Sequence, residues 1–170
     1  MKKVIFIIVL ILIAGGFFFL PAVRVLSVSS RKNPEQVFYS TADCKEGFII
    51  SYTHSVNKGR VHDYYKALPD GTLELYQTQF VSYGAGIPEP EEIPGAVFSV
   101  TKEGYFITNV RRKVPRLVMA VGIIANHSIA TGSTMRTENE YFLTDFFAPQ
   151  TSIILEIKRV SLFRYINRRH

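Results

Sequence analysis

Two histidines are the residues of this chain best suited to do chemistry. His54 and His62 lie eight positions apart in the stretch YTHSVNKGRVHDYY, residues 52–65, and Asp63 follows the second one. Imidazole nitrogens bind transition metals or transfer protons, and a neighbouring carboxylate can orient them. His127 is the third internal histidine. The stretch therefore indicates either a metal or catalytic site or a hairpin that carries two histidines.

A hairpin with the three-residue turn Asn57-Lys58-Gly59 is the local structure that this stretch predicts. Asn favours the start of such a turn, and Gly accepts the left-handed conformation that ends it. In the resulting register His54 faces His62, while Ser55 and Asp63 lie on the opposite face. Because cross-strand Cβ atoms are about 5 Å apart, the two imidazoles would be close enough to share a metal.

No complete catalytic motif accompanies the histidines. The sequence has no H-E-x-x-H motif, no pair of cysteines and no G-x-S-x-G elbow. His54 cannot readily activate Ser55, because adjacent residues of a strand point to opposite faces. We therefore predict a protein that is not an enzyme and holds no cofactor or metal. A metal-dependent hydrolase that uses His54, His62 and His127 is the alternative, and a purely structural envelope protein is a further one.

The second candidate feature is the glycine-rich stretch SYGAGIP, residues 82–88. Its two glycines and its proline predict a sharp bend at the end of a strand. The bare N–H groups of such a bend can receive an anionic ligand, although the stretch is not a phosphate loop. The predicted ligand-binding or partner-binding residues are His54, Ser55, His62, Asp63, Tyr65, Ser82, Tyr83, Gly84, Gly86 and His127.

Strand patterns surround both features. Apolar and polar residues alternate in the segments 61–68, 73–81 and 152–160. The stretch Pro69-Asp70-Gly71 predicts a turn between the first two segments. A continuous apolar run, residues 117–125, fits a strand covered on both faces. Short strands with frequent turns predict an all-β fold for residues 35–170, a small antiparallel sandwich or barrel.

The N-terminal segment has a different character. Residues 4–23 contain no charge, and as a helix they would extend about 30 Å, the thickness of a bilayer core. Lys2 and Lys3 precede this run, as in a signal anchor, and no A-x-A cleavage pattern follows it. We therefore predict a single transmembrane helix within an anchor and linker, residues 1–34. The β domain would then lie outside the cytoplasm, at the plasma membrane.

The net charge of +6 is concentrated at the two ends of the chain. Residues 1–34 and 158–170 each carry five basic residues and no acidic one, whereas the stretch between them has an excess of acidic residues. A nucleic-acid-binding protein would need a basic stripe on the fold itself, so we predict no nucleic acid partner. The basic C-terminal tail suits solvent or anionic lipid headgroups. Cys44 is the single cysteine, which excludes an internal disulfide.

Three blocks of sequence resemble those of one known group of proteins. They are YTHSV at residues 52–56, SYGAGIP at 82–88 and VGIIAxH at 121–127. With them, roughly residues 46–130 resemble an uncharacterised bacterial family of short extracytoplasmic proteins, a domain of unknown function. Members are often encoded beside tripartite ATP-independent periplasmic (TRAP) transporters of the type whose solute receptor is called TAXI. The resemblance implies an accessory role beside such a transporter, with the permease, the receptor or a small anionic solute as partner.

Overall fold

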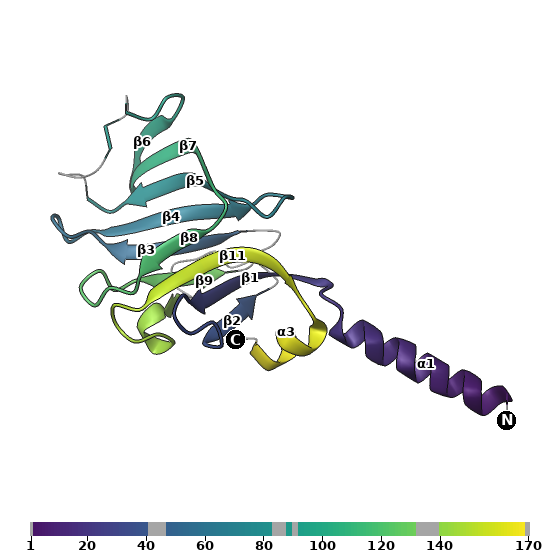
Figure 1. Ribbon diagram of the computed structural model, residues 1–170. Helices are drawn as coiled ribbons and strands as arrows, with labels where there is room; N and C mark the ends of the chain where they lie inside the picture. The colour runs from purple at the N-terminus through teal and green to yellow at the C-terminus, as the bar shows by residue number, and fades with distance from the viewer. Residues whose placement is uncertain (1, 41–46, 83–87, 90–91, 132–139, 169–170) are drawn as a thin grey trace.

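Two antiparallel β-sheets form the body of the molecule, and one helix projects away from it (Figure 1). The computed structural model describes residues 2–40, 47–82, 88–89, 92–131 and 140–168. In the described part, the smaller sheet has the strand order β2-β1-β11-β8, and the larger sheet has the order β10-β9-β3-β4-β5-β7-β6. Every strand pairing is antiparallel, which confirms the predicted all-β fold of the sandwich type.

The smaller sheet is built around strand β1, which is buried along most of its length. Its strands are β1 (Val23–Ser30), β2 (Val37–Ser40), β8 (Leu117–Ala120) and β11 (Ser152–Val160). β1 thus belongs to the β body, although its residues lie in the segment expected to be an anchor and linker. The apolar run at 117–125 is a strand only as far as Ala120, and one face of β8 is exposed, with Val118 46% exposed. The prediction of a strand covered on both faces is therefore wrong.

The larger sheet carries the two sequence features described above. Its strands are β3 (Phe48–Thr53), β4 (Arg60–Ala67), β5 (Leu73–Phe80), β6 (Val97–Thr101), β7 (Gly104–Val114), β9 (Ser128–Thr131) and β10 (Tyr141–Phe142). The predicted turn between β4 and β5 is confirmed: the Leu68 N–H donates to the Thr72 carbonyl, and Gly71 has a φ of 90°.

The main core lies where the two sheets face each other. Ile50, Tyr65 and Leu75 of the larger sheet pack in one cluster with residues of the smaller sheet such as Leu26 and Leu155. We call this side of the larger sheet its inner face and the other side its outer face. Because side chains alternate along a strand, two consecutive residues of the same strand lie on opposite faces of the sheet.

The N-terminal helix α1 (Lys2–Phe19) is shorter than the uncharged run that predicted it. Pro21 disfavours a helical conformation of the residue before it, and the chain enters β1 from Val23 onward. No helix among the described residues is long and apolar enough to cross a membrane, so the predicted transmembrane helix over residues 4–23 is not confirmed.

Two short helical segments complete the described fold, the 3₁₀ helix η3 (Leu143–Asp145) and the C-terminal α3 (Leu162–Arg168). The ring of Phe163 in α3 lies against the rings of Phe18 and Phe19, with centroid distances of 6.0 and 5.5 Å. Part of the basic C-terminal tail is therefore a helix that packs on the end of α1, beside the smaller sheet (Figure 1).

Candidate functional site

The hairpin of β3 and β4 has a longer loop than the sequence predicts. Its pairing ends with Thr53 opposite Arg60, so residues 54–59 form the connection. The His54 N–H donates to the Gly59 carbonyl over 2.9 Å, and Lys58, with a φ of 57°, takes the left-handed conformation. The predicted three-residue turn and the predicted pairing of His54 with His62 are therefore wrong.

A contact from a distant segment stabilises this loop. The Asn57 side-chain amide donates to the Ser82 carbonyl over 3.2 Å, and its oxygen accepts the Gly59 N–H at 2.9 Å. A Cβ on Gly59 would come within 2.4 Å of the Ser82 hydroxyl, so the loop and the end of β5 fit closely together. Local turn preferences cannot reveal a contact between residues that are 25 positions apart.

The observed register assigns the residues of the hairpin to the two faces of the sheet. Ile50 pairs with Asp63, and Tyr52 pairs with Val61, so these side chains share the inner face. Ser51 pairs with His62, and both lie on the outer face. Asp63 and His62 are therefore consecutive residues whose side chains lie on opposite faces of the sheet.

The three internal histidines make separate contacts. The His54 Nδ1 accepts the Val56 N–H at 3.3 Å, and the His127 Nδ1 accepts the Gly122 N–H at 3.0 Å. The His62 Nδ1 forms a hydrogen bond with the Ser51 hydroxyl at 2.8 Å. Within the described ranges, no group of three His, Cys, Asp or Glu residues is placed to hold a metal. The shared metal site, which the hydrolase alternative requires, finds no support in this geometry.

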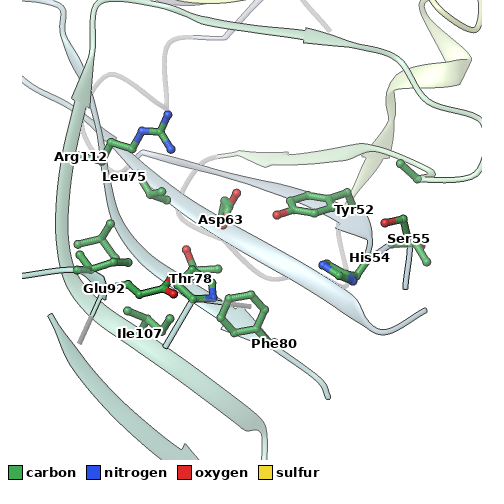
Figure 2. Close-up of a pocket in the computed structure, with 15 residues that line it drawn as sticks. Tyr52, His54, Ser55, Asp63, Leu75, Thr78, Phe80, Glu92, Ile107 and Arg112 are labelled. Carbon is green, nitrogen blue, oxygen red and sulfur yellow. The ribbon is translucent and has the colours of Figure 1, made fainter. Parts of the chain in front are cut away.

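A cavity of about 710 Å³ opens on the inner face of the larger sheet (Figure 2). Strands β3, β4, β5 and β7 supply most of its wall. The apolar part of the wall includes Leu75, Phe80, Ile93, Ile107 and Val110. The polar part includes Tyr52, Thr53, His54, Ser55, Asp63, Thr78, Glu92 and Arg112. A concave, mainly apolar space with a few polar groups is typical of a small-molecule site.

An irregularity in β7 directs Arg112 toward this cavity. The pairing of β5 with β7 moves from Gln77 opposite Thr108 to Leu75 opposite Arg112, so β7 carries extra residues at this point. Asn109 and Arg111 in the bulge have φ values of 61° and 55°. Such bulges bend a strand and change the direction of its side chains, and they are frequent beside binding sites.

Asp63 is the most enclosed charged group of the cavity. Its half-buried carboxylate lies between Tyr52 and Thr78, and the Tyr52 hydroxyl points toward it (Figure 2). Burial raises the pKa of Asp63 to about 6, against the opposing effects of a hydrogen bond with Thr78 and of the Arg112 charge. Burial, followed by the Asp63 charge, also raises the pKa of Tyr52. The cavity thus contains a carboxylate whose charge is poorly solvated, a property that is common at functional sites.

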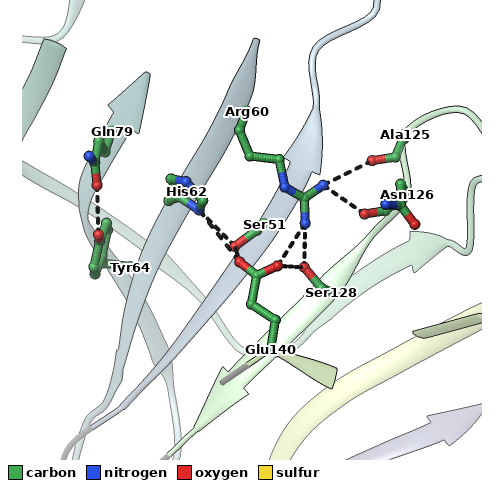
Figure 3. Close-up of polar contacts among 9 residues, drawn as sticks. All are labelled: Ser51, Arg60, His62, Tyr64, Gln79, Ala125, Asn126, Ser128 and Glu140. Atoms are coloured by element: carbon green, nitrogen blue, oxygen red, sulfur yellow. Dashed lines mark hydrogen bonds and ion pairs between the residues drawn. The ribbon is translucent and has the colours of Figure 1, made fainter. Parts of the chain in front are cut away.

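A polar network occupies the outer face behind the cavity (Figure 3). Glu140 accepts hydrogen bonds from the hydroxyls of Ser51 and Ser128, each at 2.6 Å, and from the Arg60 guanidinium at 2.9 Å. These bonds hold the pKa of Glu140 below its usual value, although burial acts in the opposite direction. Burial lowers the pKa of His62, whose Nδ1 is 3.8 Å from Glu140. The network joins strands β3, β4 and β9, and its groups satisfy one another, so it fits a structural role.

The predicted site residues divide between these environments. His54, Ser55 and Asp63 line the cavity, and His62 belongs to the outer network. Tyr65 stacks on Phe48 in the core at a centroid distance of 5.2 Å. Ser82 lies against the hairpin loop, and His127 packs beside Tyr52 at 5.9 Å. The remaining three, Tyr83, Gly84 and Gly86, are outside the described residues.

Several residues of the cavity were not predicted from the sequence: Leu75, Thr78, Phe80, Glu92, Ile107 and Arg112. Thr78 and Phe80 follow from Asp63 and Val61 once the register of β4 and β5 is known. Arg112 depends on the bulge in β7, whose left-handed residues are not glycines and so have no distinctive sequence signal.

The comparison with known proteins places this hairpin and its neighbours in a family. The model of a family described as a domain of unknown function, DUF1850, matches residues 48–137, more than half of the chain. The chain belongs to the DUF1850 family. The matched region contains β3, β4, β5 and β7, which form most of the cavity wall. No curated protein and no solved structure matches the chain. The expected membership of an uncharacterised family is confirmed.

Proposed function

We propose that this DUF1850 chain is a non-enzymatic accessory protein that binds a small solute at the outer face of the plasma membrane and serves a TRAP transporter of the TAXI type. The cavity of about 710 Å³ is the observation that carries the proposal. Its volume is within the range of roughly 300–1,000 Å³ that small-molecule sites occupy, and its lining combines an apolar wall with a few polar groups.

The arrangement of the polar groups favours binding over catalysis. His54 uses its Nδ1 to accept the Val56 N–H of its own loop, and the Ser55 side chain is exposed at the edge of the cavity. Among the described lining residues, no hydrogen bond joins a hydroxyl nucleophile to a histidine base, which a serine hydrolase would require. A metal-dependent hydrolase would need the histidines to lie together, and their contacts keep them in different parts of the sheet.

Attachment to the membrane is the second part of the proposal. Helix α1 projects from the β body, and Val4, Ile5 and Phe6 are 57–65% exposed next to Lys2 and Lys3. Lipid would cover apolar side chains that the body leaves uncovered, and the lysines would meet anionic headgroups. This attachment does not depend on α1 spanning the bilayer.

The link to a TRAP transporter rests on the three sequence blocks and the gene context typical of proteins that carry them. Co-purification of the chain with a fused TRAP permease or a TAXI receptor, in mild detergent, is the expected result. Absence of association, together with unchanged solute uptake in a strain lacking the protein, would remove this part of the proposal and leave solute binding untouched.

Solute binding is tested by blocking the cavity. A library of small metabolites is screened for compounds that raise the thermal unfolding temperature, because a ligand at one hundred times its Kd adds about 2.7 kcal/mol of stability. Val110→Trp fills the cavity from β7 and should abolish the shift. Val100→Trp, at an exposed position of β6, is the matched control and should keep it. Equal shifts in both variants would contradict binding in this cavity.

A further inference from the structure

The charge distribution of the cavity indicates which class of solute it takes. The described lining contains two carboxylates, Asp63 and Glu92, and one guanidinium, Arg112. Glu92 and Arg112 are exposed, so water screens both of them at the opening. Asp63 is the carboxylate enclosed by the wall, and it determines the electrostatic potential where a ligand would be most desolvated.

Asp63 forms no ion pair among the described residues, although the Arg112 charge acts on it from the opening. Ion pairs join Arg60 to Glu140, Lys66 to Glu74, Lys158 to Glu156 and Arg168 to Glu35, and none of the described basic side chains forms one with Asp63. Thr78 supplies a hydrogen bond, which is a weaker compensation for a buried charge than an ion pair. The carboxylate thus has unused capacity to accept hydrogen bonds from a ligand.

Aromatic rings border the same part of the cavity. Tyr52 and Phe80 both line the cavity, and the Tyr52 hydroxyl points toward Asp63 (Figure 2). The face of an aromatic ring attracts a cation, and it also covers the apolar carbons next to that cation. Leu75 and Ile107 extend this apolar surface away from the carboxylate. A carboxylate flanked by aromatic and aliphatic side chains is complementary to an amphipathic cation.

We propose that the solute is a small organic amine, whose protonated nitrogen donates hydrogen bonds to Asp63 and whose apolar part lies against Phe80 and Ile107. The inference rests on the proposed solute-binding function and names its ligand class. It replaces the small anionic solute expected from the sequence, because an anion at this position would be repelled by Asp63.

The test uses three aryl probes of nearly equal size: 2-phenylethylamine, 2-phenylethanol and phenylacetate. Their binding to the full chain in detergent is measured by isothermal titration at neutral pH. The amine should bind at least about tenfold more tightly than the alcohol, because hydrogen bonds to charged groups are the strong ones. Phenylacetate should bind most weakly. Butylamine and cyclohexylamine are added to sample other apolar shapes.

Asp63→Asn is the decisive variant, and Asp70→Asn, at an exposed turn outside the cavity, is its matched control. Asp63→Asn should weaken amine binding about tenfold or more and change alcohol binding less than about threefold. Asp70→Asn should change both affinities less than about threefold, because an exposed charge outside the cavity is screened. Removing a poorly solvated charge should leave the fold intact, and a cooperative unfolding transition of Asp63→Asn would verify this.

Three results would overturn the inference, and they separate the amine class from the proposed function. Phenylacetate binding as tight as that of the amine, blocked by Val110→Trp, would contradict the amine class and retain solute binding. Amine binding that Asp63→Asn leaves unchanged would have the same meaning. Absence of binding by every probe, together with a metabolite screen that shows no shift sensitive to Val110→Trp, would overturn both the amine class and the proposed function.

Discussion

Asp63 and His62 are consecutive residues of β4, and their side chains lie in different environments. The pleat of β4 turns Asp63 toward the cavity and His62 toward the Glu140 network. Burial disfavours the charged form of both residues, so it raises the pKa of Asp63 and lowers the pKa of His62. The His62 imidazole is compensated by the Ser51 hydroxyl and by nearby Glu140, whereas Asp63 has only the hydrogen bond with Thr78 and the charge of exposed Arg112 to compensate it.

Asp63→Asn should therefore stabilise the unliganded protein at neutral pH. A rise of the Asp63 pKa from 3.8 to about 6 corresponds to about 3 kcal/mol of destabilisation when the carboxyl is ionised. The folded state binds this proton more tightly than the unfolded state, so the favourable contribution is complete below pH 3.8 and is lost as the pH rises to about 6. The groups that act on Asp63 are Tyr52, Thr78 and Arg112 on the neighbouring strands β3, β5 and β7, and Tyr65, two residues further along β4 itself.

Urea unfolding of both proteins between pH 4 and pH 7 is the measurement. The stability gained by Asp63→Asn should grow with pH and level off above about pH 6. Asp70→Asn is the control, because Asp70 is exposed and a hydrogen bond from the Thr72 N–H lowers its pKa. Its pH dependence should not resemble that of Asp63→Asn. If the difference in stability between the wild type and Asp63→Asn did not change with pH, it would contradict a raised pKa of Asp63 in the folded protein.

At the scale of elements, the Glu140 network stabilises the larger sheet behind the cavity. Glu140→Gln leaves Arg60 without its carboxylate, and should cost about 2–3 kcal/mol in the free energy of unfolding, since one partner of a mostly buried pair loses its counter-charge. Glu156→Gln removes a more exposed pair with Lys158, and should cost less than about 1 kcal/mol. Equal costs, measured by urea unfolding, would argue against a structural role of the network.

The Asn57 side chain stabilises the loop that joins β3 to β4, and its substitution tests this contribution. Asn57→Ala removes the contacts with the Gly59 N–H and the Ser82 carbonyl, and should cost about 1–2 kcal/mol because the loop depends on both. Val56→Ala, at a side chain that is 64% exposed, should be within about 0.5 kcal/mol of the wild type. Chemical unfolding of the two variants distinguishes this loop from the three-residue turn, in which Asn57 would have no contact with Ser82.

Local sequence patterns predicted the kind of elements in this fold better than their boundaries and pairing. Alternation in β4 and β5 and the turn at Gly71 follow from nearest neighbours, and these predictions hold. The Asn57 side chain in the hairpin loop bonds to Ser82, and the place of Arg112 at the edge of the cavity depends on the bulge in β7. Both depend on partners that are distant in the sequence, so the sequence identified Asp63 as a candidate without showing which side chains surround it.

At the scale of the whole molecule, the β body and helix α1 are separable. The core clusters draw on strands of the two sheets and on residues around η3, whereas the described contacts of α1 with the body run mainly through Phe18 and Phe19 to Phe163 of α3. The cavity lies on the larger sheet, while α1 adjoins the smaller sheet and α3 (Figure 1). Solute binding and membrane attachment should thus depend on different parts of the chain.

A chain that begins at Ala22 is expected to keep solute binding and to lose membrane attachment. It retains all of β1, so it should unfold cooperatively within about 5 °C of the full chain, and it should bind 2-phenylethylamine with an unchanged Kd. It should leave the membrane pellet on fractionation of cells and remain unbound to vesicles that contain anionic lipid. Retention on vesicles would show that the body holds the membrane without α1, through Phe163 and the other exposed apolar residues of α3, Leu162 and Ile166. In that case α3 and not α1 would be the attachment element, and Phe163→Ser would release the protein.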